Sequence, residues 1–393
     1  MDLLQEAKNL PLQEYRRWLH SHAETGFDLQ NTRSYVEKQL KNMKISANFC
    51  GKSGIFAEIH GEIPGKTVLL RADMDALPIK EEAKIPFLSK NGNMHACGHD
   101  LHTAMLLGAA ELLMNHREEL CGTVRLMFQP AEEILQGAAD MIEHGVLEGV
   151  DEAVMLHVLT GSELPTGTVI LPAAGVSAPS ADYFTIEVRG SGCHGALPHT
   201  GIDPIIPACH ILQALQTIQT REMPTEEHVV LTVGSFQAGS APNVIADTAV
   251  LKGTMRTYSE EVRQQFKNRM THMARRMAST FRAEADVVFD AGCPTLLNDE
   301  QLVKQAEKTL PLLLGDEMVL TAEKLSRTAR GSGSEDFAYI SQQVPALMLA
   351  LSAGQKSKGH SYPTHHPKVT FDEESLPYGA AVYAQMALKR ADA

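Results

Sequence analysis

The sequence predicts an α/β protein: a larger domain with a mixed, largely parallel sheet flanked by helices, and a smaller inserted α+β domain. Three observations predict it. A chain of 393 residues is long enough for two domains, because a domain usually has roughly 100–200 residues. Short apolar runs alternate with helical patterns at both ends of the chain. The segment between them follows the order β-α-β-β-α-β, which is typical of a ferredoxin-like domain.

The first part of the larger domain, residues 1–178, alternates helical and extended patterns. Apolar residues at helical spacing predict helices over 2–22, 31–43, 101–117 and 135–144. Short apolar runs predict strands over 54–60, 67–72, 123–128 and 153–158. Because strands that alternate with helices usually form βαβ units, these strands are expected to build a largely parallel sheet.

A smaller domain is predicted over 179–292. Small residues and proline near 173–181 indicate a linker. After it, the patterns predict strands over 183–189, 229–236, 248–254 and 285–289, and helices over 204–219 and 260–280. From about residue 294 the α/β pattern returns, with helices over 299–314 and 373–389, a Ser/Gly-rich loop over 331–334 and a strand over 346–352. The larger domain therefore resumes over 293–393.

Composition excludes several classes of protein. Lys and Arg number 35 against 48 Asp and Glu, a formal net charge of −13, and so acidic a chain lacks the field that holds a phosphate backbone. No apolar run reaches the ~18 residues of a membrane span. Residues 1–6 do not resemble a secretory signal, and the six Cys lack the spacing of a disulfide framework. We therefore expect a cytoplasmic protein that binds neither nucleic acid nor membranes.

Polar side chains gather at the ends of the predicted strands. Asp73 and Asp75 follow the strand at 67–72, Glu132 and Glu133 follow the strand at 123–128, and His157 ends the strand at 153–158. A His-rich segment at 95–102 precedes a helix, and residues 364–367 close the loop after the last strand. Since ligands bind at the carboxyl ends of strands in open α/β sheets, these groups are expected to converge.

The segment 95–102 carries the most specific local signal, with three His, one Cys and one Asp in eight residues. Cys97 and His99 are two residues apart and can point the same way from an extended segment. Thiolate with imidazole suits Zn²⁺, and imidazole with carboxylate also suits Mn²⁺ or Co²⁺. The alternative is a helix cap in which Asp100 caps the helix and the imidazoles are solvated. The density of ligand-type residues favours a metal site.

The adjacent acids Glu132 and Glu133 can perform two different tasks, since neighbouring side chains diverge. One can bind metal while the other removes a proton from a metal-bound water. By itself, an acidic pair after a proline more often begins a helix, whose dipole it stabilises. Asp73 and Asp75 have a similar alternative as turn residues, or they bridge metals or orient the ligands without binding the ion.

The inserted domain offers weaker signals. A glycine-rich turn at 190–199 carries His194 and His199, which in an ordinary turn would be exposed imidazoles. The turn lacks the later Gly and Lys of a phosphate-binding loop. Arg256 could bind a substrate carboxylate with its guanidinium fork, or it could be a solvated charge at a strand end, and Asn243 is equally weak alone. Residues 333–337 could be a helix N-cap followed by acids.

Taken together, these motifs resemble the dinuclear metallo-amidohydrolase family of aminoacylases, hippurate hydrolase and plant indole-acetyl-amino-acid hydrolases. Carboxypeptidase G and the succinyl-diaminopimelate desuccinylases are more distant relatives. The resemblance follows the chain in order through the segments at 71–78, 95–102, 129–133, 157, 194–199, 243, 256, 334–337 and 365–367.

The resemblance implies two divalent metal ions per subunit, with zinc or manganese expected and cobalt or nickel as alternatives. The implied ligands are Cys97, His99, Glu133, His157 and His365. The last of them could instead be the neighbouring His366. Four further residues would orient the ligands without binding the ions: Asp73, Asp75, Asp100 and His102.

The resemblance also implies how the residues act. Glu132 would be the general base that activates the metal-bound water, and His194 of the inserted domain would stabilise the oxyanion. The residues implied to contact the substrate are Asn243, His199 and Arg256. The inserted domain would be a lid through which a homodimer or a higher homo-oligomer forms.

The expected reaction is hydrolysis of the amide bond of N-acyl-L-amino acids, which are small-molecule substrates. Two alternatives stay open. A dipeptidase or carboxypeptidase would use the same metal site and differ in its substrates. A non-catalytic metal-binding oligomer would hydrolyse none of them, but the intact Glu132 argues against it.

Overall fold

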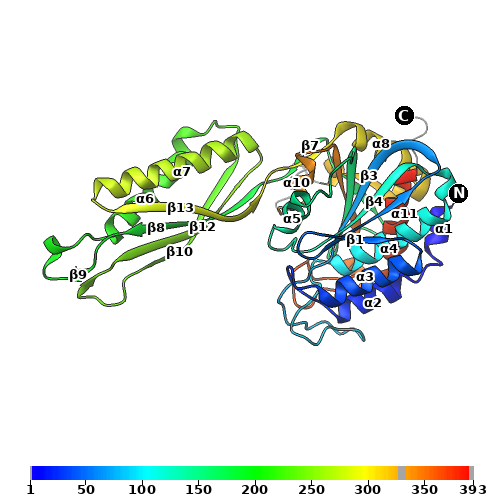
Figure 1. Ribbon diagram of the computed structural model, residues 1–393, viewed down its shortest axis with the longest axis horizontal. Coiled ribbons are helices and arrows are strands. Elements are labelled where there is room, and N and C mark those ends of the chain that lie inside the picture. Colours follow the sequence, from blue (N-terminus) through cyan, green and yellow to red (C-terminus); the bar gives the residue numbers. More distant parts are fainter. Residues whose placement is uncertain (1, 326–332, 389–393) are drawn as a thin grey trace. The chain divides into compact units, whose positions relative to one another are not determined.

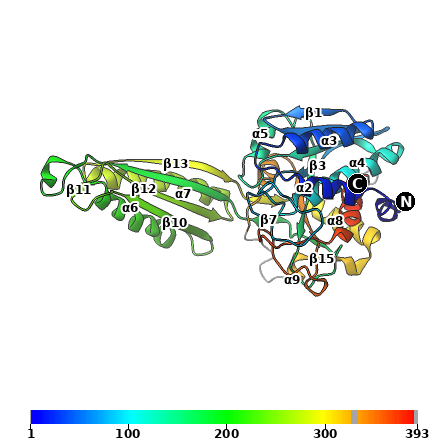
Figure 2. The same cartoon turned by 90° about the horizontal axis from the view of Figure 1, so that it is seen from below.

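The computed structural model describes residues 2–325 and 333–388, which form two compact units (Figure 1, Figure 2). The first contains residues up to 177, from 297 to 325 and from 335 to 388, and the second contains 178–296 with 333 and 334. Each unit has its own hydrophobic core. The second unit is inserted between parts of the first. The predicted loop at 331–334 lies partly outside the described residues.

The first unit contains, in the described part of the chain, a mixed sheet of eight strands (Figure 1). Their order is β1 (Ala47–Cys50), β2 (Gly54–His60), β4 (Cys121–Gln129), β3 (Ile63–Asp73), β5 (Glu152–Leu159), β16 (Ala346–Ser352), β6 (Val169–Leu171) and β15 (Val319–Thr321). β4, β3, β5 and β16 are parallel neighbours, whereas β1–β2, β2–β4 and β16–β6 are antiparallel pairs. The predicted mixed, largely parallel sheet is confirmed.

Helices flank this sheet. The two deepest, α4 (His99–Asn115) and α11 (Leu376–Leu388), pack against each other. The same core receives side chains from α1 (Leu3–Ala7), α2 (Leu12–Ser21), α3 (Gln30–Asn42) and α8 (Glu300–Leu314). α5 (Gly137–Glu143) packs on β4, α10 (Ala338–Ser341) packs on β16, and α9 (Ala322–Leu325) follows β15. α4 is apolar around most of its circumference, as a helix buried on nearly every side must be.

Some elements differ from their prediction. The helix predicted over 2–22 is two helices, because Pro11 has no N–H to donate and disfavours the helical conformation of Leu10 before it. The sequence also does not predict β1, β6 and β15, which have only four, three and three residues. Runs this short show no measurable periodicity.

The second unit has a four-stranded antiparallel sheet with two helices packed against it (Figure 2). The strand order is β10 (Val229–Ala238), β12 (Thr248–Thr257), β8 (Ala181–Arg189) and β13 (Glu284–Cys293). The helices are α6 (Ile205–Thr217) and α7 (Glu260–Thr280). Numbered along the chain, the strands lie in the order 2-3-1-4, so the ferredoxin-like prediction is confirmed.

Four short strands form two small sheets. β9 (Cys193–His194) pairs with β11 (Val244–Ile245) in the second unit, and β7 (Gly175–Ala178) pairs with β14 (Leu296–Asn298). Among the helices that the structure describes, none has the length and apolar character needed to cross a membrane.

Candidate metal centre

The candidate site lies where the order in which the chain adds strands to the central sheet reverses. From β3 the chain passes through α4 to β4 on one side, whereas from β5 it continues to β6 on the other side. β3 and β5 are neighbours, so their carboxyl ends form the crevice in which α/β sheets bind ligands. Asp73 ends β3, and His157 lies near the end of β5.

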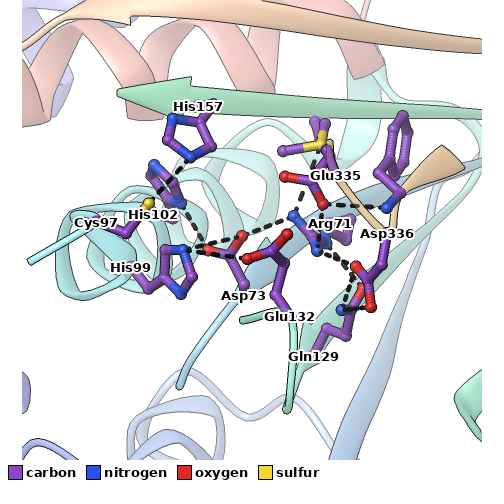
Figure 3. Close-up of polar contacts among 12 residues, drawn as sticks. Arg71, Asp73, Cys97, His99, His102, Gln129, Glu132, His157, Glu335 and Asp336 are labelled. Carbon is purple, nitrogen blue, oxygen red and sulfur yellow. Dashed lines mark hydrogen bonds and ion pairs between the residues drawn. The ribbon is translucent and has the colours of Figure 1, made fainter. Parts of the chain in front are cut away.

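Cys97 is the centre of the first group of ligand-type side chains (Figure 3). Its Sγ lies 3.5 Å from His157 Nε2 and 3.3 Å from His365 Nε2. His157 donates its Nδ1–H to the carbonyl of Val158 at 2.8 Å, which leaves Nε2 facing the thiol. Burial lowers the pKa of His157 to about 3. The imidazole is therefore in the neutral form that binds metal.

His99 completes the group from the first turn of α4. Its Nδ1–H donates to the carbonyl of Asp75 at 2.8 Å. Its Nε2 is buried and has no hydrogen-bond partner among the described residues, although Glu132 Oε2 and Glu133 Oε1 both lie 3.9 Å away. Glu133 Oε1 is likewise buried and without a hydrogen-bond partner among the described residues, and it lies 3.6 Å from His365 Nε2. Buried polar atoms without partners are rare, and a cation would satisfy these.

These donors fit divalent metal ions. Cys97, His99 and His157 bring their ligand atoms within 4.8 Å of one another, and so do Cys97, Glu133 and His365. Cys97 belongs to both groups, so the set is large enough for two ions. Sulfur, imidazole and carboxylate together suit zinc and neighbouring transition metals. Burial raises the pKa of the Cys97 thiol, so binding a metal ion as thiolate would release its proton.

Glu132 is a buried acid beside this cluster (Figure 3). Burial raises the pKa of its carboxyl well above the usual range, and the carboxylates of Glu335 and Asp336 raise it further. Asp75 fixes the turn, because its Oδ1 and Oδ2 accept the backbone N–H groups of Glu132 and Glu133 at 3.0 and 3.2 Å. The two glutamates can therefore occupy defined and different positions.

A fully buried arginine holds the acids behind the site (Figure 3). Arg71 lies 2.7 Å from Asp73 Oδ2, 2.8 Å from Asp336 Oδ1 and 2.9 Å from Glu335 Oε1, and it donates to Gln129 Oε1 at 2.9 Å. No role is predicted for Arg71 or Gln129 from the sequence. The alternation of side chains along β3 could have indicated a role for Arg71, since Arg71 and Asp73 are two residues apart and share one face of the strand.

The residues expected to support the ligands divide into two kinds. Asp73 and Asp75 contact the site residues described above, and His102 donates to Asp73 Oδ1 at 2.6 Å. Asp100 instead faces α2, where Arg16 Nε and His20 Nδ1 lie 3.1 and 2.9 Å from its Oδ2. Asp100 therefore ties α4 to α2.

The two histidines at 365 and 366 differ in direction. His365 points at Cys97 and adopts a φ of +65°, a conformation that non-glycine residues avoid unless the surroundings impose it. His366 stacks on Tyr362 with ring centroids 4.3 Å apart, and its Nδ1 accepts the N–H of Lys368 at 3.0 Å. Of the two, His365 belongs to a group of side chains that could hold a metal ion, with Cys97 and Glu133.

Four predicted residues lie in the second unit. His194 is exposed on β9, next to Val244 of β11, and Asn243 precedes that strand. His194 Nδ1 accepts the N–H of Ala196 at 3.1 Å, so in the neutral ring Nε2 carries the proton. His199 is exposed in a short turn at Pro198–Thr200. Arg256 donates to Ser334 Oγ at 2.6 Å.

Comparison with known proteins decides the family. The model of Peptidase family M20/M25/M40 matches residues 69–389. The chain belongs to this hydrolase family. An N-acetyl-L-cysteine deacetylase of Bacillus subtilis is 40% identical over 366 residues, 92% of this chain and 83% of the relative. Arabidopsis thaliana IAA-amino acid hydrolase ILR1-like 4 is 37% identical, covering 95% and 84%. Thermostable carboxypeptidase 1 of Saccharolobus solfataricus is 34% identical, covering 99% of each chain.

A solved M20 structure supports the same conclusion. The Bacillus subtilis YXEP protein, a dinuclear metal binding peptidase from the M20 family, superimposes with a TM-score of 0.79 at 34% identity, covering 96% of each chain. The resemblance to dinuclear metallo-amidohydrolases is confirmed. The groups of ligand-type side chains described above therefore occur in a chain whose family includes a dinuclear metal binding peptidase.

Proposed function

We propose that this M20 protein hydrolyses the amide bond of N-acyl-L-amino acids in a metal-dependent reaction. The observation that carries the proposal is the set of unpartnered ligand atoms around Cys97, with the Glu132 carboxyl beside it. The deacetylase and the IAA-amino acid hydrolase among the relatives support this substrate class.

We assign two divalent ions to Cys97, His99, Glu133, His157 and His365. When bound there, such ions lower the pKa of water and polarise the carbonyl of an amide. The protein supplies the geometry: the Nδ1–H groups of His99 and His157 are held by backbone carbonyls, which aims both Nε2 atoms into the cluster.

Glu132 would move the proton. Its carboxylate accepts a proton from the attacking water and then gives it to the nitrogen of the leaving amino acid. Burial raises the pKa of this carboxyl, which makes its carboxylate a stronger base toward the water.

Four residues of the second unit would act on the substrate. The outward Nε2–H of His194 would donate to the oxyanion that forms at the carbonyl. Arg256 would bind the α-carboxylate of the amino acid, with Asn243 and His199 as further contacts. The cytoplasmic location and the homo-oligomer formed through this unit stay predictions.

A carboxypeptidase or dipeptidase reaction is the second candidate. It is supported by thermostable carboxypeptidase 1 of Saccharolobus solfataricus, for which the match covers 99% of both chains. Both candidates use the same metal centre and the same Glu132. They differ only in whether the group on the amide carbonyl is a simple acyl chain or an aminoacyl residue.

The test is a substrate panel with metal-free and metal-reconstituted protein. The chain is treated with a chelator, reloaded with Zn²⁺, Mn²⁺, Co²⁺ or Ni²⁺, and assayed on acetyl-, benzoyl- and indoleacetyl-amino acids and on dipeptides. We expect hydrolysis of an acyl-amino acid that disappears on chelation and returns on reloading. Turnover of dipeptides alone would favour the second candidate. Reloaded protein that hydrolyses neither class would contradict both.

A further inference from the structure

The central sheet divides at the candidate metal centre. β3 pairs with β4 as far as Asp73↔Gln129, and β5 pairs with β16 as far as Leu159↔Ser352. Between β3 and β5, however, the pairing in the described chain runs only from Val68↔Glu152 to Arg71↔Met155. We call the place where these two strands cease to pair the fork. Asp73 and His157 lie just beyond it, one on each side.

A tyrosine of α11 reaches into the fork. The hydroxyl of Tyr383 donates to the carbonyl of Arg71 at 2.7 Å and accepts the N–H of Leu156 at 3.0 Å. In a parallel ladder with this register, that carbonyl and that N–H would be partners of each other. Tyr383 is fully buried, and burial raises the pKa of its phenol, so the hydroxyl keeps the proton that it donates.

Two residues of α4 occupy a position farther along the fork. The N–H of Val158 donates to His102 Nε2 at 2.9 Å, and the carbonyl of Asp73 accepts from Thr103 Oγ1 at 2.9 Å. This N–H and this carbonyl would also be ladder partners if the strands continued together. Side chains therefore take two of the positions where backbone groups of β3 and β5 would otherwise bond to each other.

His102 spans the opening. Its Nδ1–H donates to the Asp73 carboxylate at 2.6 Å, on the β3 side, while its Nε2 accepts from β5. Both ring nitrogens are thus in use, and the neutral tautomer with the proton on Nδ1 is the one that fits. His102 has no nitrogen left for a metal ion, although it lies close to His99 and Asp73.

The backbone on both sides of His157 is bound by side chains of the fork. The N–H of Leu156, the residue before it, donates to the Tyr383 hydroxyl. The N–H of Val158, the residue after it, donates to His102 Nε2. The His157 ring itself bonds to the Val158 carbonyl. If β5 closed onto β3, this histidine would move toward Asp73, and its Nε2 would not keep its present distance of 3.5 Å from Cys97 Sγ.

We infer that Tyr383, with His102 and Thr103, is a positioning residue that keeps β3 and β5 apart and so sets the spacing of Asp73 and His157. This inference rests on the proposed function, because it assumes that His157 binds a metal ion. The alternative is that the Tyr383 hydroxyl only satisfies two buried backbone groups. That alternative predicts a loss of stability without a change at the metal.

The test is Tyr383→Phe, which removes one hydroxyl, with Tyr15→Phe as the matched control. Tyr15 is a buried tyrosine of α2, outside the fork. Co²⁺ is the probe: its affinity is measured by competition with a chelator, and its visible absorption reports the geometry of its ligands. We expect Tyr383→Phe to lower Co²⁺ affinity by about 10–100-fold and to change the spectrum, while Tyr15→Phe changes neither.

A second pair of variants covers the case in which Tyr383→Phe does not fold. Thr103→Val removes the donor to the Asp73 carbonyl, whereas Thr103→Ser keeps it; we expect an altered Co²⁺ spectrum in the first and the wild-type spectrum in the second. Wild-type spectrum and affinity in both Tyr383→Phe and Thr103→Val would overturn the fork inference alone. If the wild-type protein itself bound no Co²⁺, the proposed metal centre would fail, and the inference with it.

Discussion

At the scale of single residues, the two adjacent glutamates should separate into two phenotypes. Glu132→Gln removes the proton acceptor but keeps the shape of the side chain, so we expect hydrolysis to fall by about 10²–10⁴-fold, the usual effect of losing a general base. Metal content should stay at the wild-type level. Steady-state kinetics and metal analysis of the same preparation check both points.

Glu133→Gln is the control for this prediction. Its Oε1 is one of the unpartnered buried atoms, so its loss should lower metal content as well as activity. Parent-rate hydrolysis by Glu132→Gln, or metal loss in Glu132→Gln as severe as in Glu133→Gln, would contradict the division of tasks.

His20 should make stability depend on pH. It is buried between Asp100 Oδ2 at 2.9 Å and Glu81 Oε1 at 3.0 Å. Although burial disfavours the charged ring, Asp100 and Glu81 raise its pKa to about 9. Because this pKa lies above that of the unfolded chain, the contribution of His20 is complete below about pH 6.5 and is lost as the pH rises through 9.

The measurement is denaturant unfolding of the wild type and His20→Gln from pH 6 to 9.5. We expect the variant to be less stable at pH 6 by roughly 3 kcal/mol at most, the equivalent of the pKa shift. The difference in free energy of unfolding should shrink toward pH 9.5. A difference that stayed constant over this range would show that His20 folds uncharged.

The residues that the sequence could identify are those with an unusual local pattern. Cys97 and His99 stand in a dense His/Cys segment, and the structure places them in one cluster with His157 and His365. Arg71 and Tyr383 have no such pattern. Their neighbours in the site come from distant segments, such as Asp336 for Arg71 and Leu156 for Tyr383, and only the folded chain brings these together.

At the scale of elements, the start of α4 depends on Gly98. This residue has a φ of +92°, and a Cβ there would lie 2.4 Å from Val158 Cγ2 and 3.2 Å from the Phe371 ring. The turn thus needs glycine for its backbone and for the contact with β5. Gly92 has the same φ of +92° but nothing within 4 Å of its would-be Cβ.

These two glycines make a matched pair. Gly92→Ala should cost roughly 1 kcal/mol for the left-handed conformation alone. Gly98→Ala should cost about 1–3 kcal/mol more, because the methyl group must displace Val158. Denaturant midpoints of the two variants give the difference. Equal losses in both would mean that α4 and β5 can move apart without cost.

Element length decided how well the secondary structure could be predicted. The sequence places β16 at Ala346–Ser352 and α7 at Glu260–Thr280 with their observed bounds, since both show a long, regular pattern. β6 and β15 have three residues each and exist through pairing with neighbours distant in sequence. Such edge strands are fixed by tertiary contacts, which a local pattern does not contain.

At the scale of the whole molecule, the division of the chain follows from the change in pattern after the linker. The sequence predicts an inserted segment at 179–292, and the contacts in the structure divide the chain at 178 and 296. The order of elements identifies an insertion, but its limits depend on which core each connecting residue joins. The residues proposed to bind metal all lie in the first unit, and those proposed to contact the substrate in the second.

This distribution predicts that metal removal affects the two units unequally. Metal ions at a free concentration about 100 times their dissociation constant stabilise the unit that binds them by about 2.7 kcal/mol. This stabilisation raises the unfolding temperature of that unit by roughly 5–10 °C. Because each unit has its own core, calorimetry should resolve two transitions, and a chelator should lower only one. Ile211→Ala, in the core of the second unit, should lower the other, since a large-to-small change there costs about 2–5 kcal/mol. A chelator that moved the Ile211-sensitive transition would place metal in the second unit, and a single transition that both treatments shift would mean that the two cores unfold together.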